Sequence, residues 1–222
     1  MKYLLHIDTS TDVGTVAISS DGAPVSSLST QESRNHAGAI NNMITQLVAD
    51  ANISLKHLSA ITVCAGPGSY TGLRIGLATA KGLCYALDKP LMLDNRLSLL
   101  AYRAYRQFPA CSRYVALLTA REKEYFIGIY DQDFKEVMPP QHIPEHELPH
   151  AAEKNGSTYI ITDMAQDMAR DLYISNNFQI ENDTKIDLKS WAVYSFEKYN
   201  CNHFVNLMNA EPFYLKQVYT HK

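Results

Sequence analysis

The glycine-rich stretch at residues 64–79, CAGPGSYTGLRIGLAT, is the part of the sequence whose residue types could cradle a phosphate. A P-loop has the spacing GxxxxGK[ST], and neither Gly66 nor Gly68 is followed by a glycine at the required position. The dinucleotide spacing GxGxxG fits Gly66 and Gly68, but its third position is Thr71. Pro67 also removes one backbone N–H from the loop. Both nucleotide motifs therefore fail on spacing.

The alternative role for these glycines is close packing. Gly72, Gly76 and Ala80 recur at intervals of four, which places them on one stripe of a helix where another backbone can approach. Apolar residues occupy much of the remaining circumference: Leu73, Leu77, Leu83, Cys84 and Leu87. Such a helix is buried on more than one side, against its own sheet and against either the rest of the chain or a partner. Phosphate contact stays open beside this, because a helix N-terminus attracts anions.

The first half of the chain predicts the order βββαβα. Residues 3–8, 15–19 and 24–30 read as strands, with a hairpin signal at SDG, and residues 60–66 read as another short buried strand. Apolar residues at spacings of three and four predict a helix over about 36–51. A second helix runs to about Leu87, where Asp88-Lys89-Pro90 ends it.

The second half repeats the opening pattern. A shift of 111 positions, half of the 222 residues, places Tyr3 on Tyr114, Leu5 on Ala116 and Ile18 on Ile129. This indicates a duplicated topology. The remaining elements are strands at 114–119 and 125–131, a proline- and histidine-rich connector at 139–150, a strand at 157–162, and helices near 165–175 and 190–200. We predict two closely packed domains, residues 1–105 and 106–222.

Composition narrows the classes of function. The net charge of −3 gives the whole chain no general attraction for nucleic acid. No apolar run reaches the length of a membrane span, and the first residues do not form a signal peptide, so we expect a cytoplasmic protein without a membrane partner. The cysteines, Cys64, Cys84, Cys111 and Cys201, never form a CxxC pair, which favours free thiols over disulfides or zinc.

Three stretches, HIDTSTDVGTVAI, CAGPGSYTGLRIGLATAKGL and the terminal AEPFYLK, resemble the TsaB (YeaZ) family of bacterial proteins needed to make threonylcarbamoyladenosine in tRNA. The GPGSYTGLRIG run is highly specific, whereas the second half matches mainly by its layout and its last segment. The resemblance implies an α/β, actin-like (ASKHA, ribonuclease H-like) fold with two related subdomains, each a mixed sheet flanked by helices. The last segment could pack back on the first subdomain.

The resemblance also implies a non-catalytic role. In that system the paralogue TsaD transfers the threonylcarbamoyl group to the adenosine 3′ of the anticodon, TsaB is the subunit that TsaD needs, and the small ATPase TsaE joins them. Contact with tRNA would then be shared or indirect.

We expect the helices at 36–51 and 70–87 to bind TsaD in a bundle, and to form a homodimer when the chain is alone. The expected interface residues are Ala39, Ile40, Met43, Ile44, Leu47, Gly72, Leu73, Gly76, Ala80 and Leu83. Gly76→Leu is expected to abolish partner binding and leave the subunit folded.

Histidine spacing argues against a metal site. The catalytic relative carries two histidines four residues apart on its first helix, whereas here Ile40 stands four residues after His36. His142, His146 and His150 are also spaced by four, but Pro144 and Pro149 interrupt any helix that would align them. We therefore predict no bound metal and a solvated loop at the second set.

The nucleotide site of the actin-like fold looks incomplete. Asp8 ends the first strand, but Thr9 and Ser10 follow it instead of a glycine turn. The shift of 111 places Thr119 opposite Asp8, so the paired carboxylate is missing, and STYIITDMAQDM lacks the expected glycine pair. We expect Asp8 to cap backbone amides in a turn.

We expect no cofactor in the isolated chain. A nucleotide at the assembled interface could lie near Asp8, Thr9, Ser10 and Arg74. Arg74 could equally be a surface residue or pair with a carboxylate of its own fold. Arg121 resembles an arginine common at that position in the family, and no role follows for it from the sequence.

Two other functions stay open. The chain could be a small ASKHA-type ATPase or kinase that uses Asp8, or a homodimeric scaffold outside tRNA modification. A protease is excluded, because the sequence has neither GxSxG nor HExxH and no serine, histidine and aspartate that form a triad.

Overall fold

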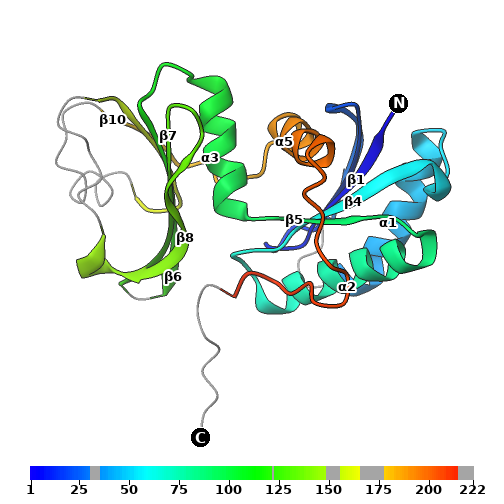
Figure 1. Cartoon of the computed structure of the whole chain (residues 1–222). Helices are drawn as coiled ribbons and strands as arrows, with labels where there is room; N and C mark the ends of the chain where they lie inside the picture. The colour runs from blue at the N-terminus through cyan, green and yellow to red at the C-terminus, as the bar shows by residue number, and fades with distance from the viewer. Residues whose placement is uncertain (31–35, 122, 149–155, 166–177, 215–222) are drawn as a thin grey trace, which may run out of the picture. The chain divides into compact units, whose positions relative to one another are not determined.

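The computed structural model of the chain describes residues 1–30, 36–121, 123–148, 156–165 and 178–214 (Figure 1). The chain divides into two compact units. Unit 1 comprises Met1–Arg96 and Leu188–Phe213, and unit 2 comprises Leu97–Asp187 and Tyr214–Lys222. The polypeptide therefore leaves unit 1 after its fifth strand and returns to it for a final helix.

Unit 1 contains a five-stranded mixed sheet with the order β3-β2-β1-β4-β5. Its strands are β1 (Tyr3–Asp8), β2 (Thr15–Ser20), β3 (Ala23–Ser29), β4 (Leu58–Cys64) and β5 (Leu91–Asp94). The first three strands pair antiparallel, and β4 and β5 pair parallel. The hairpin predicted at SDG is confirmed: Asp21 and Gly22 both adopt positive φ, as a tight two-residue turn requires.

Helices cover both faces of this sheet. The helices α1 (His36–Asp50) and α2 (Tyr70–Leu87) lie on one face, α5 (Leu188–Asn200) lies on the other, and the short helix η1 (Leu55–His57) precedes β4 (Figure 1). Alternation along β1 serves both layers, since Leu5 and Ile7 join the core under α1 and α2 while Leu4 packs with Phe196 of α5. α2 ends at Asp88, which caps it in the left-handed conformation.

The segment after α5, residues 203–213, forms what we call the strap. The backbone N–H of Val205 donates to the carbonyl of Leu91 at 2.9 Å, and that of Phe213 donates to Ala65 at 2.8 Å. The strap therefore covers the edge of β5 and ends at the loop between β4 and α2 (Figure 1).

Unit 2 repeats the topology of unit 1. Its strands, β6 (Arg113–Arg121), β7 (Glu124–Asp131), β8 (Glu136–Pro144), β9 (Thr158–Thr162) and β10 (Phe178–Glu181), follow the order β10-β9-β6-β7-β8. Two antiparallel pairs and two parallel pairs occur in the same succession as in unit 1. The duplication predicted from the shift of 111 is thus present as strand topology. The helix α3 (Arg96–Gln107) packs on one face of this sheet.

Several elements differ from the prediction. The predicted connector at 139–150 begins as strand β8 and the short helix η2 (Glu145–Glu147). β8 tolerates Pro139 and Pro140 because it is an edge strand and its pairing with β7 is irregular there. The elements β5, α3 and β10 were not predicted, and the helix predicted near 165–175 lies almost entirely outside the described residues.

The division into units also differs from the predicted boundary after residue 105. Leu97, Leu100 and Ala104 of α3 pack against strands of the second sheet, so the start of α3 belongs with unit 2. The return of Leu188–Phe213 to unit 1 has its own cause, because apolar residues of α5 and the strap complete both faces of the first sheet.

Candidate functional site

The glycines at the start of α2 pack against the turn after β1. A Cβ atom built on Gly72 would lie 1.9 Å from the carbonyl oxygen of Thr9, and one built on Gly76 would lie 2.3 Å from Thr9 Oγ1. Both distances are far below van der Waals contact. A Cβ built on Gly68 would similarly lie 2.2 Å from the Ser10 carbonyl oxygen. The glycines thus let α2 approach the backbone of its own unit, which favours the packing interpretation of this stretch.

Hydrogen bonds secure the same contact. Thr9 Oγ1 donates to the carbonyl of Gly72 at 2.7 Å, and the N–H of Ser69 donates to the Ser10 carbonyl at 2.8 Å. Ser69 is the N-cap of α2, and its hydroxyl accepts from the Gly72 N–H. The turn at residues 8–10 and the first turn of α2 are therefore one hydrogen-bonded unit.

Asp8, Thr9 and Ser10, the residues predicted near a phosphate, are all buried. Asp8 Oδ1 accepts from the backbone N–H of Ser10 at 2.9 Å, which is the amide-capping arrangement expected for a turn aspartate. Next to them, burial raises the pKa of the Cys64 thiol, and the Asp8 carboxylate raises it further. The thiol is therefore kept protonated at neutral pH, which disfavours a role as a nucleophile.

The residues predicted as a partner interface lie mostly inside unit 1. Seven of them are buried in the chain's own core: Ile40, Ile44, Leu47, Gly72, Leu73, Gly76 and Ala80. The other three, Ala39, Met43 and Leu83, are half-buried. The apolar stripes of α1 and α2 face the sheet, because that face supplies the apolar surface of β1, β2 and β4. The surface that a partner could contact therefore lies on the opposite side of the two helices.

We call that side of α2, made of Arg74, Ala78, Gly82 and Tyr85, the outer face. All four residues are exposed, and Tyr85 retains 84% of its surface. A Cβ built on Gly82 would meet nothing within 4 Å, in contrast to Gly72 and Gly76. The guanidinium of Arg74 lies 4.2 Å from the ring centre of Tyr70. Exposed positions of α1 are likewise polar or small: Asn41, Asn42, Thr45, Gln46, Ala49 and Asp50.

The sequence predicted no carboxylate in unit 2 at the position that corresponds to Asp8. The structure places one there, from the neighbouring strand. Thr119, opposite Asp8 under the shift of 111, donates both its N–H and its hydroxyl to Asp163 Oδ1, at 2.8 and 2.9 Å. Asp163 directly follows β9, which runs parallel to β6. Parallel neighbours end at the same edge of a sheet, so the carboxylate comes from the next strand. It caps Thr119 as Asp8 caps Ser10.

The histidines spaced by four do not form one face among the described residues. His142 lies on β8, half-buried, with Nε2 3.2 Å from Glu124 Oε2. His146 is exposed on η2, and His150 lies outside the described residues. The predicted solvated loop is thus wrong for His142, because β8 pairs with β7 there. No group of three or more potential metal ligands occurs within the described ranges. His36 begins α1, and Arg121, at the end of β6, is exposed.

A buried polar cluster on the α5 face of unit 1 was not predicted. The Asp94 carboxylate at the end of β5 is fully buried and accepts four hydrogen bonds. The donors are Thr62 Oγ1 at 2.6 Å, Trp191 Nε1 at 2.7 Å, Ser195 Oγ at 3.0 Å and Lys198 Nζ at 2.6 Å. Burial opposes ionisation of Asp94, yet Lys198 and these donors hold its pKa below its ordinary value. The cluster joins β4 and β5 to α5.

His6, on the same face of the sheet, is fully buried and neutral. Its Nε2 lies 2.8 Å from Ser19 Oγ, and its ring meets Trp191 edge-on at 4.8 Å. Burial lowers the pKa of His6 to about 4, against a smaller opposing effect of the Asp94 charge.

We predict that unit 1 loses stability as the pH falls from about 6.5 to about 4. The folded state resists protonation of His6, whereas the unfolded chain accepts the proton near pH 6.5. The stabilisation is therefore complete above the unfolded pKa and decreases on acidification, by roughly 3 kcal/mol for a shift of this size. Urea titrations at pH 7, 5.5 and 4.5 measure it. His6→Asn should flatten the profile in this range, and an unchanged profile would show that His6 is not the cause.

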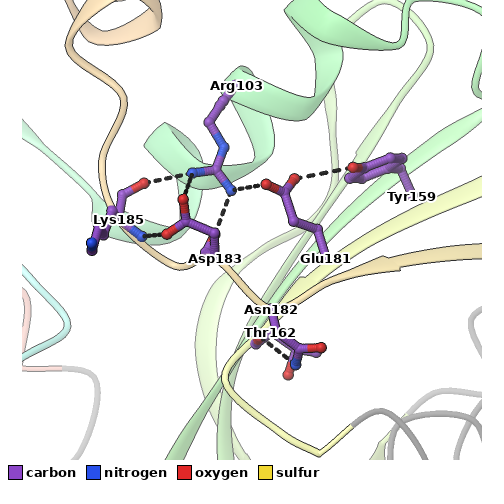
Figure 2. A network of polar contacts seen from close by, with 7 residues as sticks. All are labelled: Arg103, Tyr159, Thr162, Glu181, Asn182, Asp183 and Lys185. Carbon is purple, nitrogen blue, oxygen red and sulfur yellow. Dashed lines mark hydrogen bonds and ion pairs between the residues drawn. The ribbon is translucent and has the colours of Figure 1, made fainter.

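Unit 2 contains a second polar network, centred on Arg103 of α3 (Figure 2). The guanidinium is nearly buried and binds Glu181 Oε1 at 3.1 Å, the Lys185 carbonyl at 2.7 Å, and the Asp183 carbonyl. Tyr159 donates its hydroxyl to the other oxygen of Glu181 at 3.0 Å. The network fixes the segment that leaves β10 toward α5, and its carboxylates are engaged in that task.

Neither network has a clear signal in the sequence. Asp94 and Arg103 look like ordinary charged residues, and most of their partners lie some 80 to 100 positions away. Only the apolar surroundings LMLD and LSLLAYRAY hint that these charges are buried. The described helices also include none long and apolar enough to cross a membrane.

The two mixed sheets with the same strand order, each flanked by helices, define an α/β fold of the actin-like (ASKHA) class. A putative N-acetylmannosamine kinase from Listeria monocytogenes has this fold as well, with a TM-score of 0.53 at 10% identity over 89% of this chain and 99% of that one. A crystal structure from Pseudomonas aeruginosa, described as an uncharacterized protein similar to peptidase YEAZ, is more alike. Its TM-score is 0.78 at 25% identity, over 97% of this chain and 100% of that one.

Sequence comparison places the chain within this class. It is 27% identical to the tRNA threonylcarbamoyladenosine biosynthesis protein TsaB of Haemophilus influenzae, over 99% of this chain and 95% of that protein. Residues 28–175 match the family model described as TsaD: tRNA N6-adenosine threonylcarbamoyltransferase. The chain belongs to the TsaB (YeaZ) family.

Proposed function

We propose that the chain is a non-catalytic subunit needed to form N6-threonylcarbamoyladenosine in tRNA, and that it binds and activates the TsaD transferase. The observation that carries this proposal is the outer face of α2. It exposes a nearly fully accessible Tyr85 beside the small residues Ala78 and Gly82, on a helix whose other side is buried. We infer the pathway from the names of the relatives. We infer the binding surface from the exposed side of α2.

The outer face has the composition of a helix-binding surface. Ala78 and Gly82 are four residues apart, so a partner helix can approach α2 closely along them. Tyrosine is among the residues that contribute most to binding when a partner covers them, and Tyr85 lies at one end of this stripe. The polar residues of α1, such as Asn42 and Gln46, would form the rim.

The burial of Asp8 favours an accessory role over an ATPase or kinase. Its Oδ1 accepts from the Ser10 N–H, and the whole residue is buried beside the start of α2. A catalytic carboxylate for phosphate chemistry needs oxygens that face a metal ion in an accessible site. A nucleotide near Arg74 in the assembled complex, contact with TsaE, and shared contact with tRNA stay predictions. A second copy of the chain would compete for the same outer face, which accounts for the predicted homodimer.

Reconstituted tRNA modification tests the proposal. TsaD and TsaE from the same organism, with tRNA and the threonylcarbamoyl donor, should form the modified nucleoside only when this chain is added. ATP turnover by the chain alone should stay at background. Full modification without the chain would contradict the proposal, and ATP turnover that disappears in Asp8→Asn would favour the enzyme instead.

Gly82→Leu should lower the affinity for TsaD at least 100-fold without unfolding the chain. The space around Gly82 is open, so the side chain fits the free subunit but stands where the partner helix would pack. Calorimetry of binding measures the loss. The matched control is Asn200→Leu, which adds the same side chain at an exposed position of α5, on the opposite face of the sheet. Equal binding by both variants would exclude the outer face.

A further inference from the structure

The strap is attached differently at its ends and at its middle. Its ends are held by backbone hydrogen bonds of ordinary length, from Val205 to Leu91 at 2.9 Å and from Phe213 to Ala65 at 2.8 Å. Between them, residues 206–209 form a local turn that we call the crest. Asn206, Met208 and Asn209 of the crest are exposed, whereas Leu207 is half-buried and packs against the core of unit 1.

The crest is closed by its own hydrogen bonds. Asn206 Oδ1 accepts from the N–H of Met208 at 2.9 Å and from that of Asn209 at 3.4 Å. Met208 is 85% exposed, whereas Ala210, the next residue after the crest, is only 7% exposed and belongs to the core. Met208 therefore stands out from the surface between two residues, Leu207 and Ala210, that pack on or within the core.

Lys81 of α2 connects this turn to the helix. Its ammonium group donates to the carbonyl of Met208 at 3.4 Å and to that of Ala210 at 3.3 Å. Both distances are at the long end of the hydrogen-bond range, so each contact is weak by itself. A single cation shared between two carbonyl groups is an attachment that can open, unlike the short backbone bonds at the ends of the strap.

The position of Lys81 links the crest to the proposed binding surface. Lys81 directly precedes Gly82 and lies one helical turn before Tyr85, both of the outer face. If the ammonium releases the crest, a long flexible side chain borders that face, and the turn at Met208 and Asn209 is then held to unit 1 only through its neighbours Leu207 and Ala210. A partner must then order both groups on binding, and this lowers its affinity.

We propose that Lys81 is a positioning residue that latches the crest to α2 and thereby keeps the outer face preorganised for its partner. The latch itself is a property of the free chain. Its effect on affinity rests on the proposed function, because that effect requires TsaD to bind the outer face.

Hydrogen exchange of the free chain tests the latch, with wild type, Lys81→Met, Lys81→Arg and Lys56→Met. Methionine keeps the apolar stem and removes the charge, arginine keeps the charge, and Lys56 is an exposed lysine of η1 that serves as control. In Lys81→Met the amides of Met208 and Asn209 should exchange at least tenfold faster. The amides of Val205 and Phe213 should stay within twofold of wild type, as internal controls for the fold. Lys81→Arg and Lys56→Met should resemble wild type.

Binding to TsaD tests the second part with the same variants. Lys81→Met should bind three- to tenfold more weakly, with recovery in Lys81→Arg. Unchanged exchange of the crest amides in Lys81→Met would overturn the latch, as would a uniform increase at all four amides. Faster exchange with unchanged affinity would overturn the link to the partner. If wild type does not bind TsaD, the proposed function fails, and the exchange experiment still decides the latch.

Discussion

Gly72→Ala is expected to destabilise the chain by at least about 3 kcal/mol, although it adds a single methyl group to a helix. That methyl group would lie 1.9 Å from the Thr9 carbonyl oxygen, so either α2 or the turn after β1 must move. Movement also breaks the hydrogen bond from Thr9 Oγ1 to the Gly72 carbonyl. Urea unfolding, followed by circular dichroism, measures the loss.

Another glycine of α2 provides a control that is expected to stabilise the chain. Gly82→Ala adds the same methyl group where nothing lies within 4 Å, so it should stabilise the chain by about 0.5–1 kcal/mol through helix propensity alone. Equal destabilisation by the two variants would show that α2 does not pack on Thr9 as described. The contrast also corrects the expectation for Gly76→Leu. Its side chain would collide with Thr9 inside unit 1, so the variant cannot separate folding from partner binding.

Lys198→Met is the second large expected effect, with a loss of roughly 3–5 kcal/mol at pH 7. The substitution removes the cation 2.6 Å from Asp94 and leaves a fully buried carboxylate without a countercharge. Thermal and urea unfolding at several pH values measure this. The double variant Asp94→Asn/Lys198→Met removes both charges and should recover part of the loss. If the losses in Asp94→Asn and Lys198→Met simply add up to the loss in the double variant, the coupling is contradicted.

The direction in which the stability of Lys198→Met changes with pH shows whether Asp94 is responsible. In the wild type the folded-state pKa of Asp94 is depressed, so its stabilisation is present above the unfolded pKa and lost as the pH falls through the folded value. Without Lys198, we expect burial, the largest single effect on Asp94, to outweigh the remaining donors and raise that pKa. The contribution of Asp94 then reverses, so the stability of Lys198→Met relative to the wild type improves on acidification until the carboxyl group is protonated, while the loss due to His6 is common to both proteins. A stability difference between variant and wild type that does not shrink on acidification would assign the role to another group.

The elements of the first half were predictable because local patterns determine them. Asp-Gly sets the hairpin between β2 and β3, apolar spacing sets α1, and Asp88-Lys89-Pro90 ends α2. The duplication was predictable for a similar reason, since strand and turn signals recur in the same order. β8 was missed because its prolines favour a loop, and only its place at the sheet edge permits a strand.

The orientation of the helices could not be read from spacing alone. Gly72 and Gly76 form a small-residue stripe that fits either a partner helix or the chain's own backbone, and the position of Thr9 decides between them. A turn 63 residues earlier in the chain supplies that contact. The outer face was missed for the complementary reason, because Ala78, Gly82 and Tyr85 carry no strong apolar signal.

The central claim is that the outer face of α2 binds TsaD. Size-exclusion chromatography with light scattering, applied to mixtures of TsaD from the same organism with wild type, Gly82→Leu and Asn200→Leu, tests it most directly. We predict a heterodimer with wild type and with Asn200→Leu, and separate TsaD and folded chain with Gly82→Leu. A wild-type chain that elutes apart from TsaD, or a heterodimer that survives Gly82→Leu, would contradict the claim.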